Sequence, residues 1–320
     1  NFLSSLASSQ ALKNRSLIDP FYFNLLFAAR YQDNNNDGRA ERWFTETAED
    51  IKDFIKTKGM IIERDYDAES GENPRFYNDG SPIPVFDTNS DGIFDPVGIP
   101  LNWDVNSSSD IEPSLDTFPG RSIFFHRGHG WWTGMDKPTF NMSNIDGPEK
   151  MQGNRFPVVF SVNCASGIFD NEQVPGFGVN PNATYFGESF IREHSDKGAI
   201  AFVGDTRSSH TMLNNDISKG MFDALFPDYQ DFGSSAKICR LGDLLNHAKT
   251  YVASQGWGSI DLRQEMTIYN VLGDPTFCAR VHKPLWFLYK ISTEREYDFI
   301  LRRPPLALDF DLDFIPHLPE

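Results

Sequence analysis

The chain has 320 residues, in which 29 Lys and Arg stand against 45 Asp and Glu, giving a formal net charge of −16. This length allows one large domain or two smaller ones, and the apolar fraction of 39% is that of a folded chain rather than a disordered one. The acidic balance argues against nucleic acid as a partner, because phosphate binding needs a basic face, and no apolar run approaches the ~20 residues that cross a bilayer.

Taken in chain order, five short apolar runs are typical of strands that are buried on both faces of a parallel sheet. We expect these strands at Phe21–Ala29, Met60–Arg64, Ser122–His126, Phe156–Val162 and Ala199–Gly204.

Amphipathic segments between these runs predict helices. The clearest is Glu41–Lys58, because its apolar residues fall on one stripe and Gly59 follows its end. Further helices are expected at Tyr185–His194, Asp216–Phe226, Leu241–Ala253 and Arg263–Leu272. Strands that alternate with helices indicate an α/β fold, with a doubly wound sheet and right-handed crossovers.

Two stretches depart from this alternation. Asp65–Pro119 is rich in Gly, Pro, Asn, Asp and Ser, and a connection of that length is usually functional or built around a ligand. After Pro284 the helical pattern stops, and we expect residues 284–320 to begin a small β module or a packing arm. Residues 1–283 are then one domain.

Reactive side chains follow two of the predicted strands. His129 and Gly130 come shortly after Ser122–His126. Cys164 follows Phe156–Val162 with only Asn163 between them. Open α/β sheets bind ligands beyond the carboxyl ends of their strands, so both side chains are expected at one edge. A Cys and a His in this arrangement predict a catalytic dyad in which the imidazole takes the proton of the thiol.

Neighbouring residues add candidates to this site. Trp131 either forms a wall of a substrate subsite or plugs the sheet edge. His126 competes for the catalytic role but falls inside the strand run rather than after it. A third group that orients His129 is expected among Glu63, Asp65 and Asp67, by position alone.

Several blocks resemble one known family. The strand before GHG, the strand before NC, and the blocks YFGESFIR, KGAIAFVGDTR and YNVLGDPTF are similar to the gingipain-type cysteine peptidases of the caspase-like group. The resemblance spans roughly Ile18 to Val281 and implies a three-layer α/β/α sandwich with a mostly parallel sheet. It also implies that Cys164 is the nucleophile, that His129 is the general acid and base, and that the N–H groups of Gly130 and Cys164 form the oxyanion hole.

The resemblance further implies hydrolysis of peptide bonds through a thioester, in many members after Arg or Lys, and the binding of calcium. Gingipains place a Trp over the pocket for the residue before the scissile bond, and counting along this chain gives Thr211 at that point. A pocket for a basic residue needs a carboxylate, for which Asp205 and the long loop before Ser122–His126 are the candidates. If Arg207 shares that pocket, it favours an acidic residue instead.

Two acidic loops are similar to the first half of a calcium-binding loop. Oxygen-bearing side chains alternate along each loop, and Gly stands at the sixth position, where it permits a sharp turn. Neither loop has an acidic residue at the twelfth position, so neither is an EF-hand, and turns rich in Asp and Asn also form without metal. The expected ligands are Asp33, Asn35, Asp37, Arg39 and Glu41 in one loop, and Asp87, Asn89, Asp91, Ile93 and Asp95 in the other.

The three cysteines allow at most one disulfide, so at least one thiol is free. Acidity and few cysteines favour a secreted or cell-surface protein, and the start at Asn1 is interpreted as that of a mature or excised fragment, with a propeptide or further domains in a longer precursor.

The leading hypothesis is therefore a secreted cysteine endopeptidase, with calcium as an expected structural cofactor. Two alternatives remain open: a sortase-like transpeptidase with the same dyad, and a calcium-stabilised binding module whose dyad is vestigial.

Overall fold

The computed structural model describes residues 19–83, 111–146, 155–170, 184–192, 198–233 and 235–282. All of them belong to one compact unit, which ends at Pro284. The module predicted for residues 284–320 lies outside the described residues. None of the helices in these ranges is both long enough and apolar enough to cross a membrane.

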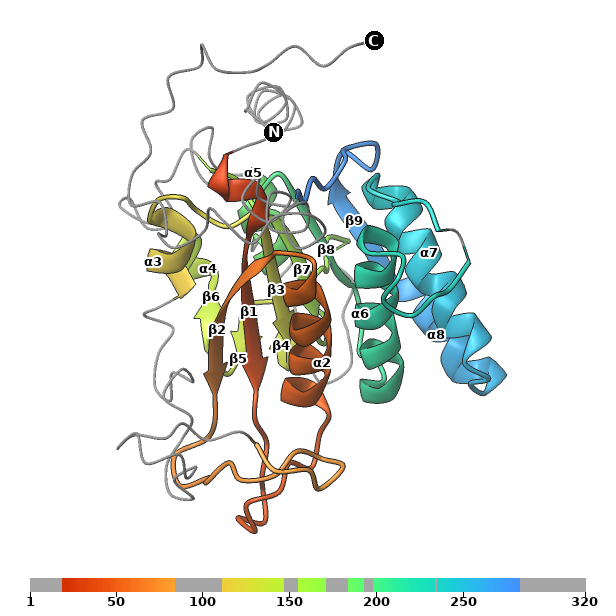
Figure 1. Ribbon diagram of the computed structural model, residues 1–320. Coiled ribbons are helices and arrows are strands. Elements are labelled where there is room, and N and C mark those ends of the chain that lie inside the picture. Colours follow the sequence, from red (N-terminus) through yellow and green to blue (C-terminus); the bar gives the residue numbers. More distant parts are fainter. Residues whose placement is uncertain are drawn as a thin grey trace, which may run out of the picture. The chain divides into compact units, whose positions relative to one another are not determined.

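A six-stranded sheet forms the centre of this unit (Figure 1). Its strand order is β2-β1-β3-β7-β8-β9, and the first five strands are parallel. The strands are β1 (Asn24–Arg30), β2 (Ile61–Asp67), β3 (Ile123–Arg127), β7 (Val158–Val162), β8 (Ala201–Asp205) and β9 (Tyr269–Gly273). The prediction of an α/β fold with a mostly parallel sheet is confirmed.

Helices cover both faces of the sheet because side chains alternate along each buried strand. In β1, Leu25 and Phe27 face the larger apolar core, whereas Leu26 faces the smaller one. The helices on the larger core are α2 (Phe44–Thr57), α6 (Thr211–Leu225), α7 (Leu241–Ser254) and α8 (Ser259–Ile268). Those on the smaller core are α3 (Ile111–Asp116), α4 (Met142–Asp146) and α5 (Phe186–Arg192).

A second, smaller sheet continues from the carboxyl end of β3. Its three antiparallel strands are β4 (His129–Trp131), β5 (Gly134–Asp136) and β6 (Phe140–Asn141). The apolar pattern of the sequence does not predict these short strands. They place His129 on a hairpin rather than on a loose loop.

Several boundaries differ from the expected ones by three residues or more. The strand expected from Phe21 begins only at Asn24, because Asp19 Oδ1 accepts the N–H of Phe21 and starts the 3₁₀ turn η1 (Pro20–Phe23). Helix α6 begins at Thr211 rather than at Asp216. The helix expected over Arg263–Leu272 ends at Ile268, and the following residues form β9, which pairs antiparallel with β8.

One disulfide joins Cys239, just before α7, to Cys278, which follows β9. It closes a loop with a sequence separation of 39 residues. The expectation of at most one bridge is confirmed, and Cys164 is the free cysteine.

Candidate active site

Cys164 lies at the carboxyl edge of the sheet, two residues beyond the end of β7. Its side chain is half-buried, and the sulfur lies 3.8 Å from the carbonyl oxygen of Ser209 and 3.7 Å from Ser209 Oγ. The Ser209 hydroxyl donates to the carbonyl oxygen of Asn163 at 2.6 Å and accepts from Asn214 Nδ2 at 2.7 Å. The segment before α6 therefore holds the thiol in place.

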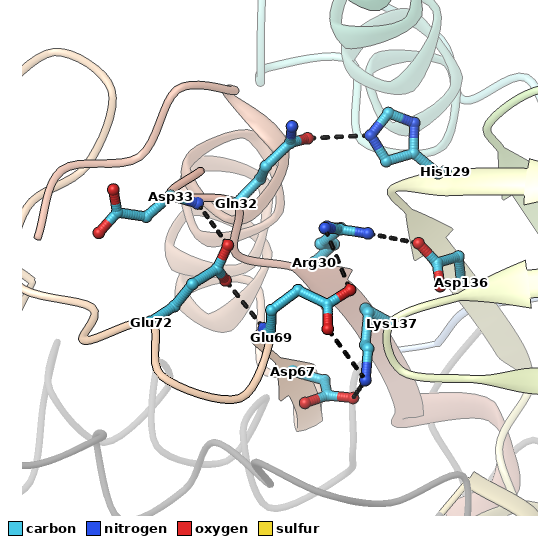
Figure 2. A network of polar contacts seen from close by, with 9 residues as sticks. All are labelled: Arg30, Gln32, Asp33, Asp67, Glu69, Glu72, His129, Asp136 and Lys137. Atoms are coloured by element: carbon cyan, nitrogen blue, oxygen red, sulfur yellow. Dashed lines mark hydrogen bonds and ion pairs between the residues drawn. The ribbon is translucent and has the colours of Figure 1, made fainter. Parts of the chain in front are cut away.

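His129 lies on β4, and a side chain from the segment after β1 fixes its ring (Figure 2). Its Nε2 lies 2.9 Å from Oε1 of Gln32, and its ring meets the ring of Phe44 edge-on at 5.2 Å between centroids. Because a carboxamide oxygen can only accept, Nε2 carries the proton in this contact and Nδ1 is left with the lone pair. His129 is thereby oriented as a base.

The surroundings keep both reactive groups uncharged at neutral pH. Burial and then the charges of three arginines lower the pKa of His129 to about 4. Burial and then the Asp205 carboxyl raise the pKa of the Cys164 thiol, against the opposing hydrogen bonds from Ser209. No hydrogen bond joins the two side chains within the described residues, an arrangement common in unliganded sites that tighten on substrate binding.

His126 has a structural place instead. It is fully buried on β3, its Nδ1 accepts from Asn163 Nδ2 at 2.9 Å, and burial lowers its pKa to about 3. The Asn163 side chain also donates to Ser161 Oγ at 2.8 Å. His126 therefore braces the residue that precedes Cys164.

The other predicted residues near the site have different surroundings. Trp131 is 41% exposed and shares a face of β4 with His129, as residues two apart on a strand do. The carbonyl oxygen of Thr211 accepts from Arg127 Nη2 at 2.7 Å. Asp205 is fully buried, and its contact with a substrate stays a prediction.

The guanidinium of Arg207 is engaged in an ion pair. Its Nη2 pairs with Asp170 Oδ2 at 2.6 Å, which joins the loop after β8 to the loop after Cys164. This ion pair removes the reason for assigning an acidic preference to Arg207.

The group that orients His129 is Gln32, which the sequence reasoning missed. The three expected candidates lie elsewhere: Glu63 accepts from Arg121 and Ser114, Asp65 is buried, and Asp67 lies 3.9 Å from Lys137 Nζ (Figure 2). A signal was nevertheless present, because Gln32 follows the end of β1 and so lies at the same sheet edge as His129.

The described calcium loop is closed by its own hydrogen bonds. Asp33 accepts from the N–H groups of Asp37 and Gly38 at 3.1 and 2.8 Å, and Asn35 Oδ1 accepts from Asp37 N at 2.9 Å. Arg39 N donates to Asp37 Oδ1, and no group of three His, Cys, Asp or Glu in the described ranges is arranged to hold a metal. Asp and Asn make such turns with or without metal, and calcium at residues 33–41 stays a prediction. The loop of Asp87–Asp95 lies outside the described residues, and calcium there stays a prediction.

Comparison with known proteins places the chain among peptidases. The family model for peptidase family C25 matches residues 13–280. No curated protein matches the chain. The described fold is similar to the crystal structure of the Arg-specific cysteine proteinase gingipain R, with a TM-score of 0.59 and 14% identity over 86% of this chain and 52% of that one.

A second similar structure is the complex of the pro- and mature domains of RgpB from Porphyromonas gingivalis. It has a TM-score of 0.58 and 14% identity, and covers 88% of this chain and 53% of that one. The chain thus spans about half the length of these structures. The expected resemblance to gingipain-type peptidases is confirmed, and the chain belongs to peptidase family C25.

Proposed function

We propose that this chain is a cysteine endopeptidase in which Cys164 is the nucleophile and His129 the general base. One observation carries the proposal: the free thiol follows β7 at the same sheet edge where Gln32 holds His129 with Nδ1 available as a base. Membership of peptidase family C25 supports the same reaction class.

In the first half of the reaction, Nδ1 of His129 takes the thiol proton as Cys164 Sγ attacks the carbonyl carbon of the scissile bond. The developing oxyanion accepts hydrogen bonds from the N–H groups of Gly130 and Cys164. The imidazolium then gives its proton to the leaving amine, the C–N bond breaks, and a thioester remains on Cys164.

Water completes the cycle. His129, again neutral, takes a proton from a water molecule that attacks the thioester, and the proton returns to the sulfur as the carboxylic acid product leaves. The low pKa of His129 leaves the imidazole unprotonated at neutral pH, so its Nδ1 can accept a proton.

The test is peptide hydrolysis by the chain and by Cys164→Ala. We expect loss of hydrolysis in the variant with an unchanged circular dichroism spectrum, and loss in the parent after treatment with iodoacetamide. Activity of the variant within about tenfold of the parent contradicts the assignment of the nucleophile. Mass analysis in the presence of an added amine separates the alternatives, since a transpeptidase yields the amide product and a vestigial dyad yields none.

We further propose that the protein works outside the cell or at its surface. The disulfide between Cys239 and Cys278 supports an oxidising compartment, where such bonds persist. A propeptide that covers the active site is proposed by analogy with the pro- and mature domains in the RgpB complex.

A further inference from the structure

The peptide group between Asn163 and Cys164 carries one of the two proposed oxyanion donors, the N–H of Cys164. A peptide group is planar and trans, so its C=O and its N–H point in opposite directions. Whatever holds the carbonyl oxygen of Asn163 therefore also sets the direction of the Cys164 N–H. Within the described residues this N–H makes no hydrogen bond, which leaves it available to an oxyanion.

Ser209 holds that carbonyl oxygen. Its hydroxyl donates to the carbonyl oxygen of Asn163 at 2.6 Å, and Asn214 Nδ2 approaches the same oxygen at 3.5 Å. Asn163 is fully buried, so solvent does not compete for its carbonyl group. The orientation of this peptide plane thus depends on a side chain from the segment before α6.

A chain of hydrogen bonds fixes the Ser209 hydroxyl in turn. Tyr269 Oη donates to Asn214 Oδ1 at 2.6 Å, and Asn214 Nδ2 donates to Ser209 Oγ at 2.7 Å. Asn214 and Tyr269 are both buried. Because the three groups donate in one direction, their bonds polarise one another. The last bond falls on the carbonyl of Asn163, and it strengthens the Cys164 N–H at the other end of the peptide group as a donor.

The peptide group on the other side of Cys164 is fixed as well. The N–H of Ala165 donates to the carbonyl oxygen of Arg207 at 3.0 Å, so it is not available to an oxyanion. Ala165 has a φ of 58°, which residues other than glycine rarely adopt unless their surroundings enforce it. The segment that follows β8 therefore bonds to both peptide groups that flank Cys164, through Arg207 and through Ser209.

Ser209 also contacts the nucleophile. Its Oγ lies 3.7 Å from Cys164 Sγ. The one proton of the hydroxyl goes to Asn163, so toward the thiol this oxygen can only accept. One side chain thus touches both the sulfur and the peptide group that supplies the oxyanion donor, and it fixes the position of one relative to the other.

We propose that Ser209 is a positioning residue of the oxyanion hole, which aims the N–H of Cys164 at the developing oxyanion by holding the carbonyl oxygen of Asn163. Asn214 and Tyr269 keep Ser209 in that position. This inference rests on the proposed peptidase function and adds a positioning residue to it. A donor that is turned away from the oxyanion stabilises the transition state less, while the sulfur keeps its reactivity.

The test compares two reactions of the same thiol. Peptide hydrolysis passes through an oxyanion, whereas iodoacetamide loses iodide from a saturated carbon and forms none. For Ser209→Ala we expect kcat/KM to fall by about tenfold to a hundredfold, which is part of the loss caused by removing an oxyanion donor outright. The rate of alkylation of Cys164 should change by less than about threefold, because a thiol is only a weak hydrogen-bond donor.

A peptide aldehyde gives a readout that does not depend on turnover. Cys164 Sγ adds to the aldehyde carbon and the thiol proton passes to the aldehyde oxygen, so the hemithioacetal carries an oxygen where the oxyanion forms. Ser209→Ala should weaken aldehyde binding by the same factor as kcat/KM and leave the binding of the matching peptide alcohol unchanged. Ser209→Thr, which keeps the hydroxyl, should restore most of both. Tyr269→Phe should cause a smaller loss of the same kind, because Ser209 keeps its bond to Asn163.

Ser218→Ala is the matched control. The Ser218 hydroxyl is buried on α6 and donates to a backbone carbonyl oxygen, that of Asn214, at 2.8 Å. The variant loses the same kind of bond as Ser209→Ala, but the bond it loses holds neither peptide group that flanks Cys164. We expect it to keep the hydrolysis, alkylation and aldehyde binding of the parent. A loss of hydrolysis as large as that of Ser209→Ala would overturn the specific role of Ser209.

Failure of this inference is distinguishable from failure of the proposed function. If the parent and Ser209→Ala cleave peptides equally well, or if Ser209→Ala loses hydrolysis and alkylation by the same factor, the role in aiming the oxyanion donor is overturned while the peptidase function stands. If the parent cleaves neither unfolded casein nor any peptide, although iodoacetamide alkylates Cys164, the peptidase proposal fails and the role of Ser209 fails with it.

Discussion

The side chain of Asn163 lies directly against the backbone of Gly130. A Cβ atom at Gly130 would come within 2.4 Å of Asn163 Cγ, closer than packed side chains allow, and Asn163 Nδ2 is held by a hydrogen bond to Nδ1 of His126. The two blocks that supply the base and the nucleophile thus share one close contact, in which only glycine fits.

Gly130→Ala should therefore lower kcat/KM by about a hundredfold, because either Asn163 or the β4 hairpin must shift and the dyad shifts with it. Gly258→Ala is the control, because a Cβ atom there would meet only Asp261 Oδ2, at an ordinary contact distance of 3.9 Å. Steady-state kinetics with one peptide measures both. Equal activity of the two variants would show that the contact at Gly130 is unimportant.

Gln32 gives a prediction with a pH readout. Gln32→Glu places a negative charge beside Nε2 of His129, which should raise the pKa of the imidazole by about one unit and move the acid limb of the kcat/KM profile upward by as much. Gln32→Ala should lower kcat without that upward shift. If the acid limb of Gln32→Glu stays where the parent has it, His129 is not the titrating base.

The resting state of the thiol can be tested directly. Since burial raises the pKa of Cys164 and lowers that of His129 to about 4, the pair is neutral rather than a thiolate and imidazolium. The rate of alkylation by iodoacetamide should then rise with pH throughout the neutral and alkaline range. A rate that is already constant between about pH 5 and pH 8 would indicate a preformed thiolate.

Glu265 predicts an unusual dependence of stability on pH. Its pKa rises to about 8 on folding, so between its ordinary value and pH 8 the folded chain holds a proton that the unfolded chain has released. The free energy of unfolding should fall as pH rises through this window, by up to about 1.4 kcal/mol per pH unit.

Denaturant unfolding at several pH values checks this. Glu265→Gln should flatten the slope, whereas Asp243→Asn, which changes an exposed carboxylate on α7, should not. A slope that persists in Glu265→Gln assigns it to another group.

Calcium is predicted to stabilise the chain through the loop of Asp87–Asp95. The carboxylates of this loop repel one another in a chain whose net charge is already −16, and a bound divalent ion relieves that repulsion. The melting temperature should therefore rise with calcium concentration. The double variant Asp87→Asn and Asp91→Asn should lose this dependence. Asp243→Asn, which changes an exposed carboxylate outside both acidic loops, is the control and should keep it. Melting curves indifferent to calcium and chelator would discard the prediction.

The parts of the fold that depend on local pattern could be predicted from the sequence. Continuous apolar runs identified all five parallel strands, because β1, β3, β7 and β8 are buried along their whole length and leave few polar positions. Strand β9 could not be identified in this way. Its residues continue a helical pattern, and only pairing with β8 selects the extended form.

The same distinction holds for the site. Cys164 and His129 were identified because each follows an apolar strand, which is a local signal. Gln32 and Arg127 were not assigned roles, because their contacts depend on which strands are neighbours and on which face each side chain emerges. The parallel register of β3 with β1 and β7 determines which side chains of these strands meet, and no local pattern encodes that register.

The disulfide between Cys239 and Cys278 has a consequence for any cut that the enzyme makes in itself. Helices α7 and α8, the turn between them and strand β9 all lie within the loop that this bond closes. A backbone cut at the exposed turn of residues 255–258 would leave two fragments covalently joined. Such a nick is invisible on a gel run without reductant. The nicked chain also cannot lose α8, whose Gln264 donates to the carbonyl oxygen of Ser208, the residue before the Ser209 that contacts Cys164. A cut in this region would therefore leave the elements around the active site in place.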